Sequence, residues 1–364
     1  MASLSTPFCK LLGIGVPVLQ APMAGGPSSR ELVAACSAAG ALGSFGHAYT
    51  QPDQMKKQSE WVRAQTDRPF GINLFVSPQP DPIDVVHQSA ALAALGPWYA
   101  EMGLPAPEPA KPPYAPDLQA QLAAVAEIRP AMFTAHLGEL EEKWVSKFKA
   151  LGIRLGTSAT CIAEAKRAEA AGLDFVIAQG GEAGGHRGTY LRDPGEALTG
   201  TLALTRLLVR AVRIPVVAAG GIMDGAGIAA VLSLGAQAAQ IGTAFIPCPE
   251  SGAPEVHKQA ILAASEDDTR VTERFSGRAA RGIANRFLRE AEAKHFPKIA
   301  FPAQNALTGR LRQASAKAGN PDFYALWSGQ AAPLARALPA AALVARLEQE
   351  TIAALRASAA FIQE

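Results

Sequence analysis

Residues 179–188 read QGGEAGGHRG, and they directly follow the apolar run FVIA at residues 175–178. An uninterrupted apolar run is typical of a strand that is buried on both faces. The glycines that follow it allow tight turns and a close approach of the backbone to a ligand. A plain turn is the alternative, but plain turns seldom combine so many glycines with a glutamate, a histidine and an arginine. The segment therefore predicts a functional loop at the carboxyl end of a buried strand, with His186 as its candidate catalytic side chain.

On both sides of this loop, short apolar runs alternate with helical stretches. Eight runs qualify as strands, at residues 18–24, 41–46, 70–76, 131–138, 153–158, 175–181, 215–221 and 238–245. Eight strand–helix units over about 250 residues are typical of a TIM barrel, which is an α/β fold. A doubly wound sheet is the alternative fold, but no GxGxxG motif follows the first strand.

Two segments depart from the alternation. Residues 77–130 separate the third strand from the fourth and contain the proline cluster LPAPEPAKPPY, which favours an insertion. After about residue 250 the pattern becomes mostly helical and ends in an amphipathic helix predicted over residues 340–357. We therefore expect a barrel over residues 1–250, with its insertion at about 77–130. A helical substrate or lid region over residues 251–364 would pack beside it.

Six arginines occupy the first part of this helical region. Their spacing favours a solvated helix face, and binding of an anionic substrate is the less favoured alternative. They are Arg270, Arg274, Arg278, Arg281, Arg286 and Arg289.

The composition gives no reason to expect a nucleic-acid or membrane partner. The 364-residue chain has a formal net charge of +2 and only 6% aromatic residues. No signal peptide and no long apolar stretch is visible, so we expect a soluble, cytoplasmic protein. The four cysteines form no CxxC pair, which argues against a structural metal site. The oligomeric state stays open.

Two further features point to a bound ligand. The seventh strand ends in Gly220 and Gly221, and the eighth contains Gly242 and Thr243. Loops after these two strands of a TIM barrel commonly bind phosphate through backbone N–H groups. Asn73 interrupts the apolar third strand, and a buried amide needs hydrogen-bond partners. Those partners are either neighbouring backbone groups or a ligand.

Together, five motifs resemble the class I nitronate monooxygenases, formerly called 2-nitropropane dioxygenases. The motifs are QAPMAGG at residues 20–26, RPFGINLF at 68–75, QGGEAGGHRG at 179–188, AAGGIMDG at 218–225 and QIGTAF at 240–245. The similarity resumes in SGRAARGIANRF at 276–287 and in LWSGQ at 326–330. Each motif alone is weak evidence, but their order and number are specific for the family. The resemblance implies a TIM barrel that binds FMN.

The resemblance also assigns roles to residues. His186 matches the family's active-site histidine, and His136 matches a second histidine of the pocket. The flavin would lie against the first strand, form hydrogen bonds with two amides, contact one glycine closely and bind through its phosphate at the last two strands. The residues concerned are Ala21, Pro22, Met23, Asn73, Gln179, Gly184, Gly220, Gly221, Gln240, Ile241, Gly242 and Thr243. The family's pocket also uses tyrosine and lysine side chains, for which Tyr114 and Lys317 are candidates.

The implied reaction is the oxidation of an alkyl nitronate, such as propionate 3-nitronate, by dioxygen to a carbonyl compound and nitrite. A nitronate is already a carbanion equivalent, whereas a neutral nitroalkane must first lose its α-proton to a base. Imidazole suits that step, so His186 is the expected base; as an imidazolium it would instead hold the nitro oxygens. An NAD(P)H:quinone or enoyl-thioester reductase on the same barrel is the second enzymatic interpretation, because such reductases share the EAGGH loop. A flavin-binding sensor is the non-enzymatic one.

Overall fold

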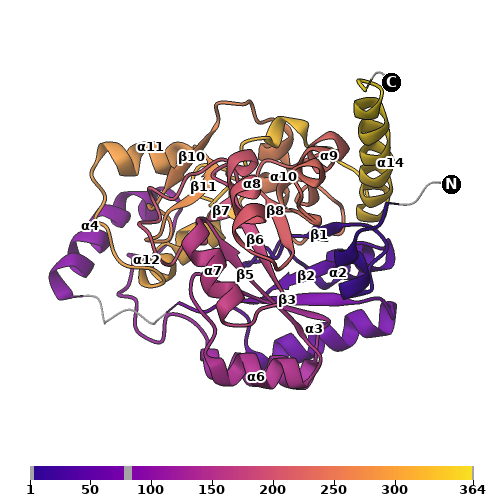
Figure 1. Cartoon of the computed structure of the whole chain (residues 1–364). Helices are drawn as coiled ribbons and strands as arrows, with labels where there is room; N and C mark the ends of the chain where they lie inside the picture. Colours follow the sequence, from indigo (N-terminus) through magenta and orange to yellow (C-terminus); the bar gives the residue numbers. More distant parts are fainter. Residues whose placement is uncertain (1–3, 78–83, 363–364) are drawn as a thin grey trace.

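The protein was analysed as a computed structural model, which describes residues 4–77 and 84–362. Its central element is a barrel of eight parallel strands (Figure 1). The strands are β1 (Val18–Gln20), β2 (Gly43–Gly46), β3 (Phe70–Phe75), β4 (Met132–His136), β5 (Arg154–Ala159), β6 (Phe175–Gln179), β8 (Val216–Ala219) and β9 (Ala238–Ile241). β1 pairs with β9, and a bridge between Leu19 and Leu42 joins it to the neighbourhood of β2. The TIM-barrel prediction is confirmed.

Three predicted strands were too long at their carboxyl ends. β1 stops at Gln20, β8 stops before Gly220, and β9 gives way to a 3-10 turn at Thr243–Phe245. Gly220 and Gly221 adopt φ values of +113° and +69°, which are incompatible with a strand. The predicted ligand-binding residues therefore lie in loops beyond the strand ends.

Helices surround the barrel. They are α2 (Arg30–Ala38), α3 (Pro52–Gln65), α5 (Leu118–Ile128), α6 (Glu142–Ala150), α7 (Ile162–Ala170), α8 (Thr201–Ala211), α9 (Gly225–Ser233) and α14 (Ala340–Ala359). Side chains cap several of them, as Ser29 does for α2 and Asp117 for α5. A short helix that the sequence analysis missed, α1 (Pro7–Leu12), buries Phe8 against Phe175 of β6, with ring centroids 5.1 Å apart.

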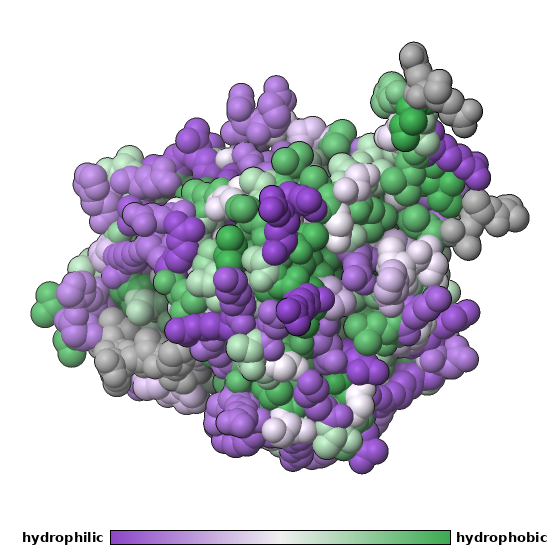
Figure 2. All heavy atoms as spheres, in the orientation of Figure 1, coloured by the Kyte–Doolittle hydropathy of each residue, from purple (hydrophilic) through white to green (hydrophobic). Residues whose placement is uncertain are grey.

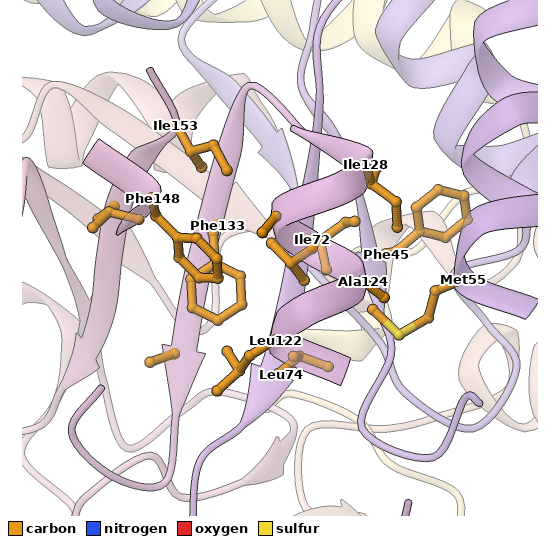
Figure 3. Close-up of a cluster of buried hydrophobic side chains, with 14 of the residues drawn as sticks. Phe45, Met55, Ile72, Leu74, Leu122, Ala124, Ile128, Phe133, Phe148 and Ile153 are labelled. Carbon is orange, nitrogen blue, oxygen red and sulfur yellow. The ribbon is translucent and has the colours of Figure 1, made fainter. Parts of the chain in front are cut away.

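A cluster of buried apolar side chains lies between one side of the barrel and the helices that cover it (Figure 3). Ile72 and Leu74 of β3 are fully buried against α5, which supplies Leu122. The rings of Phe133 and Phe148 meet edge to face with centroids 5.1 Å apart. This packing makes the barrel a rigid support for the loops at its carboxyl edge.

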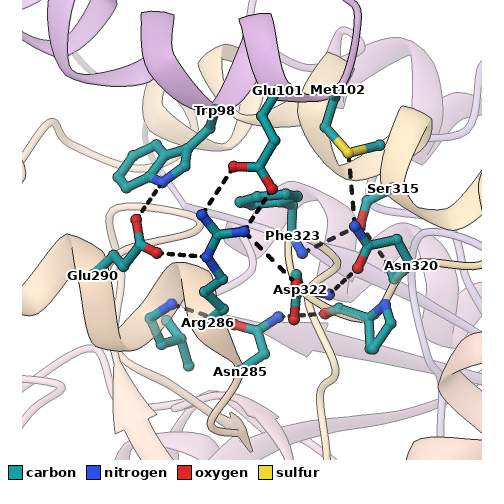
Figure 4. A network of polar contacts seen from close by, with 12 residues as sticks. Trp98, Glu101, Met102, Asn285, Arg286, Glu290, Ser315, Asn320, Asp322 and Phe323 are labelled. Atoms are coloured by element: carbon teal, nitrogen blue, oxygen red, sulfur yellow. Dashed lines mark hydrogen bonds and ion pairs between the residues drawn. The ribbon is translucent and has the colours of Figure 1, made fainter.

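The segment predicted as an insertion has two parts. α5 is a barrel helix, since it contacts α3 and α6. The excursion lies before it and contains α4 (Val85–Glu101), which packs against α11 (Arg286–Ala293) of the C-terminal region. Arg286 binds Glu101 of α4 and Glu290 of α11, and Glu290 also accepts the indole N–H of Trp98 at 2.8 Å (Figure 4). These contacts join the excursion to the C-terminal region.

The C-terminal region contains strands as well as helices. β10 (Thr269–Thr272) and β11 (Ala280–Ile283) form a hairpin, and β11 pairs with β7 (Gly185–His186) of the glycine-rich loop. The prediction of a solvated helix face was therefore wrong for Arg270, Arg274, Arg278 and Arg281, whereas Arg286 and the exposed Arg289 do lie on a helix, α11. Arg281 is buried, and Arg278 donates to the carbonyls of Arg187 and Thr189.

The remaining C-terminal helices divide between two places. α10 (Glu255–Leu262), α12 (Ala303–Leu307) and α13 (Gly309–Lys317) each contribute residues to the cavity described below. α14 instead packs on α9 and α2, on the outside of the barrel. The predicted amphipathic helix is thus confirmed, but it does not cover the barrel's mouth.

The surface mixes polar and apolar side chains, as one face illustrates (Figure 2). Exposed large apolar residues include Leu198, Leu202 and Leu207 in and before α8. None of the helices within residues 4–77 and 84–362 is both long and apolar enough to cross a membrane.

Candidate active site

One cavity of about 580 Å³ lies at the carboxyl ends of the barrel strands. It is lined by both histidines predicted as catalytic and by every residue predicted to bind the cofactor except Ile241. The side chain of Ile241 is buried in the core beside Phe245 and Ala239, because alternate residues of β9 point to opposite faces. The structure thus brings the predicted site residues together from six different strand ends.

The loop after β6 is fixed by its own charged residues. Glu182 accepts the backbone N–H of Thr201 at 2.8 Å, and so caps α8, whose preceding residue has no side-chain cap. Arg187 is fully buried and donates to the carbonyls of Gly180, Gln179 and Ala197 at 2.8–3.2 Å. Burial lowers the pKa of Arg187 to about 10. Both residues therefore shape the loop and have no free group for a substrate.

His186 is held in place through its backbone. Gln179 donates from Nε2 to the His186 carbonyl at 2.9 Å and accepts the Gly188 N–H at 2.7 Å. His136 Nε2 lies 3.3 Å from the same carbonyl, and its Nδ1 lies 2.8 Å from Ser158 Oγ. Both ring nitrogens of His136 thus have partners in the protein, and the Gln179 amide is bonded to its own loop.

The imidazole of His186 stands in an aromatic box. Its centroid lies 5.7 Å from Phe75, 5.2 Å from Phe301 and 5.7 Å from Trp327. Burial, reinforced by nearby His136, Arg278 and Arg312, lowers the pKa of His186 to about 3. The ring is therefore neutral at physiological pH.

Unpaired backbone donors lie at the ends of β8 and β9. Among the described residues, no acceptor receives the N–H groups of Gly221, Ile222 and Met223. The start of α9 is less available than the sequence suggested, because the Gly225 and Gly227 N–H groups already donate to Glu350 and Asp224. The unpaired N–H groups therefore precede the helix. Thr243 Oγ1 accepts the Gly329 N–H at 2.9 Å, which leaves the hydroxyl proton for a ligand.

Three polar side chains offer acceptors toward the cavity. Asn73 uses its amide protons on Thr134 O at 3.0 Å and Thr134 Oγ1 at 2.8 Å, so its oxygen is the group left for a ligand. Within the described part of the chain, Gln240 Oε1 and His257 Nδ1 are buried and unpaired. Both alternatives raised for Asn73 are therefore compatible with its position.

Several lining residues were missed at the sequence level. Arg312 of α13 donates to Asn305 O at 2.6 Å, to Asn305 Oδ1 at 2.8 Å and to Thr308 Oγ1 at 3.2 Å. Its Nη1 has no acceptor, and no carboxylate pairs with the guanidinium, within residues 4–77 and 84–362. Tyr49 and Tyr324 line the same cavity. Burial raises the pKa of both phenols, and the guanidinium of Arg312 partly opposes this rise. Tyr114 and Lys317 do not line the cavity. No short motif marked these residues, because they come from separate loops and helices.

Comparisons with known proteins match nearly the whole chain. A family model described as nitronate monooxygenase matches residues 5–350. Nitronate monooxygenase of Paraburkholderia phytofirmans is 45% identical, with 93% of each chain covered, and that of Pseudomonas aeruginosa is 44% identical, with 94% of this chain and 98% of the relative covered. The crystal structure of nitroalkane oxidase from Streptomyces ansochromogenes is 41% identical, has a TM-score of 0.89 and covers 96% of this chain and 99% of its own. The structure of FabK from Thermotoga maritima is 28% identical, with a TM-score of 0.79 and coverage of 99% and 100%.

Proposed function

Because this chain belongs to the nitronate monooxygenase family, we propose that it uses bound FMN to oxidise alkyl nitronates, such as propionate 3-nitronate, with dioxygen. The proposal rests on the groups that line one cavity. Backbone N–H groups without an acceptor among the described residues lie at the end of β8. The neutral imidazole of His186 and the guanidinium of Arg312, which has no carboxylate partner among the described residues, lie elsewhere on the cavity wall.

The lining residues fit a flavin mononucleotide. Gly221, Ile222 and Gly242, with the Thr243 hydroxyl, would bind a single phosphate through N–H and O–H donors. The buried, unpaired Gln240 Oε1 would accept a hydrogen bond from the ligand. Gly184 lets the loop after β6 pack directly on the backbone of residues 328–329, because a Cβ there would meet Ser328 and Gly329 backbone at 2.6–2.7 Å. A bound flavin would supply the chemistry by accepting electrons from the nitronate and reacting with dioxygen.

Arg312 would provide the counter-charge for the substrate. A nitronate carries a negative charge on its nitro oxygens, and a charged N–H donor binds such an oxygen more strongly than a neutral one. Nη1 of Arg312 would donate to it, because Nε and Nη2 already donate to Thr308 and Asn305 and no acceptor receives Nη1 among the described residues. Tyr49 and Tyr324 add hydroxyl groups near the same guanidinium. We therefore assign the anion site to this cluster.

His186 would favour substrates that are already deprotonated. A base whose pKa is about 3 accepts a proton from a neutral nitroalkane only unfavourably, since transfer becomes tenfold less favourable for each unit of pKa mismatch. A nitronate needs no such transfer. We expect nitronates to be much better substrates than the corresponding nitroalkanes. His136 would support the reaction indirectly, by holding the His186 carbonyl.

The second interpretation, a reductase that uses NAD(P)H, is separated by anaerobic mixing. Ethyl nitronate should change the visible spectrum of the bound flavin rapidly, whereas NADH and NADPH should leave it oxidised over the same period. Rapid bleaching by a reduced nicotinamide nucleotide, with no response to the nitronate, would favour the reductase. A protein that responds to neither, and turns over neither in air, would revive the sensor interpretation.

A further inference from the structure

We propose that Ser276 is a positioning residue that holds His186 as the Nε2–H tautomer, so that the unprotonated Nδ1 faces the substrate. This inference rests on the proposed function for its catalytic consequence, but the tautomer itself is a property of the protein alone. Ser276 lies in the loop between β10 and β11, far from His186 in sequence.

The hydroxyl of Ser276 has three neighbours. His186 Nε2 lies 2.9 Å from Oγ, the carbonyl oxygen of Arg278 lies 3.1 Å away, and the Arg278 N–H donates at 3.4 Å. Ser276 is fully buried, so no solvent competes for these contacts. The hydrogen bonds of these groups must therefore be made with their own protons, without help from water.

Counting protons fixes the direction of each bond. A serine hydroxyl has one proton, and the Arg278 carbonyl can only accept. If Oγ donated that proton to His186 Nε2, lone pairs on Ser276 Oγ and on the Arg278 carbonyl oxygen would face each other at 3.1 Å. If it goes to the carbonyl, Oγ has a lone pair left for the imidazole, and Nε2 must then donate. The second arrangement satisfies every group and is the one that we infer.

The other ring nitrogen is then the reactive one. Nδ1 of His186 has no hydrogen-bond partner among the described residues, and the ring lines the cavity. Because the pKa of the ring is lowered to about 3, a single neutral tautomer persists at working pH. With a nitroalkane, the α-C–H bond would break, its electron pair would form the C=N bond of the nitronate, the N=O π pair would move onto a nitro oxygen, and the proton would bind Nδ1. With a nitronate, Nδ1 would accept no proton and donate none, so the nitro oxygens would be left to Arg312.

The backbone keeps Ser276 in register with His186. β11 pairs with β7 so that Ala280 lies opposite His186, and the Arg187 N–H donates to Ala279 O at 2.9 Å. Gly277 turns the chain with a φ of +83°, and a Cβ there would meet Ile299 O at 2.1 Å. The contact is therefore built into the hairpin.

The test is nitrogen NMR of the purified holoprotein labelled with 15N-histidine, with the His186 signals identified by their loss in His186→Asn. Protonated and unprotonated nitrogens of a neutral imidazole have well-separated shifts. We expect His186 to show a protonated Nε2 and an unprotonated Nδ1 in the wild type. In Ser276→Ala the two shifts should converge, as the tautomers mix. Ser158→Ala is the matched control: it removes the hydroxyl beside His136, and should leave the His186 shifts unchanged.

Activity provides a second readout. Ser276→Ala should lower turnover of nitroethane on the order of tenfold, because the imidazole remains but is no longer oriented, and should lower turnover of ethyl nitronate much less. A protonated Nδ1 in the wild type would overturn the proposal, even if the variant failed to fold. Unchanged His186 shifts in a folded Ser276→Ala would also overturn it. An enzyme that oxidises no nitronate but shows the expected shifts would refute the proposed function and leave the tautomer assignment intact.

Discussion

Replacing Arg312 by methionine tests the proposed anion site. The change removes the positive charge and keeps a long, apolar side chain of similar reach. A hydrogen bond to a charged group contributes about 1.5–3 kcal/mol, and 1.4 kcal/mol corresponds to a factor of ten. We therefore expect the KM for ethyl nitronate to rise about ten- to hundredfold. The structure supports the upper part of this range, because the guanidinium lines the cavity and has no carboxylate partner among the described residues.

Two further variants separate charge from architecture. Arg312 also holds Asn305 and Thr308, so its loss could loosen α12 and α13. Arg312→Lys keeps the charge but loses most of these bonds, and should have an intermediate KM. Arg310→Met on the same helix removes a charge whose side chain is 49% exposed and lies 3.5 Å from Glu108, so its effect should stay below about threefold.

The assay is steady-state dioxygen consumption with ethyl nitronate at several ionic strengths, alongside the melting temperature of each variant. A KM for Arg312→Met within twofold of the wild type, in a protein that melts normally, would refute the anion site. Equal increases in KM for Arg310→Met and Arg312→Met would show that the protein's overall electrostatic field attracts the substrate, and not a contact with Arg312.

Three other outcomes are expected. His186→Asn should abolish turnover of nitroethane and lower that of ethyl nitronate modestly, because only the first requires a base; equal losses would assign His186 an architectural role. Gly221→Asp should weaken FMN retention, measured as flavin released on dilution, since a carboxylate would repel the phosphate; Gly152→Asp, at a similar φ of +76° on an open turn, is the control and should retain flavin. Stability should fall with acid: His47 has its pKa lowered to about 3 by burial, so between pH 6.5 and 3 the unfolded chain binds a proton that the native state does not. Urea unfolding at pH 7.5 and pH 5 should therefore differ by at least about 2 kcal/mol, because His136 and His186, whose pKa values burial also lowers to about 3, add to the contribution of His47; equal stabilities would contradict the buried, neutral state of these rings.

The barrel could be predicted because its signal is local and repeated. Each buried parallel strand is a short apolar run, and several of the helices that follow begin at a capping side chain, as α2, α5 and α9 do. The loop after β6 was predictable for the same reason, since its glycines and His186 adjoin one such run. The ends of β1, β8 and β9 were not, because apolar residues continue past the last paired residue.

The C-terminal half of the site could not be predicted in the same way. The hairpin of β10 and β11 has several arginines at spacings that also suit a helix, and only the pairing with β7 reveals that Arg281 is buried. Arg312 and Ser276 reach His186 and the cavity through tertiary contacts across more than one element. Such contacts correspond to no recognisable spacing of residues in the sequence. The roles of Arg312 and Ser276 depend on which nearby groups lack a hydrogen-bond partner, and only the folded structure shows this.

The most direct measurement is the simultaneous recording of dioxygen consumption and nitrite release by the purified yellow protein supplied with propionate 3-nitronate, followed by identification of the flavin released on denaturation. We predict that dioxygen is consumed, that nitrite accumulates in step with it, and that the flavin is FMN. Absence of nitrite together with stoichiometric FAD, or consumption of dioxygen only when NADH is added, would contradict the proposed function.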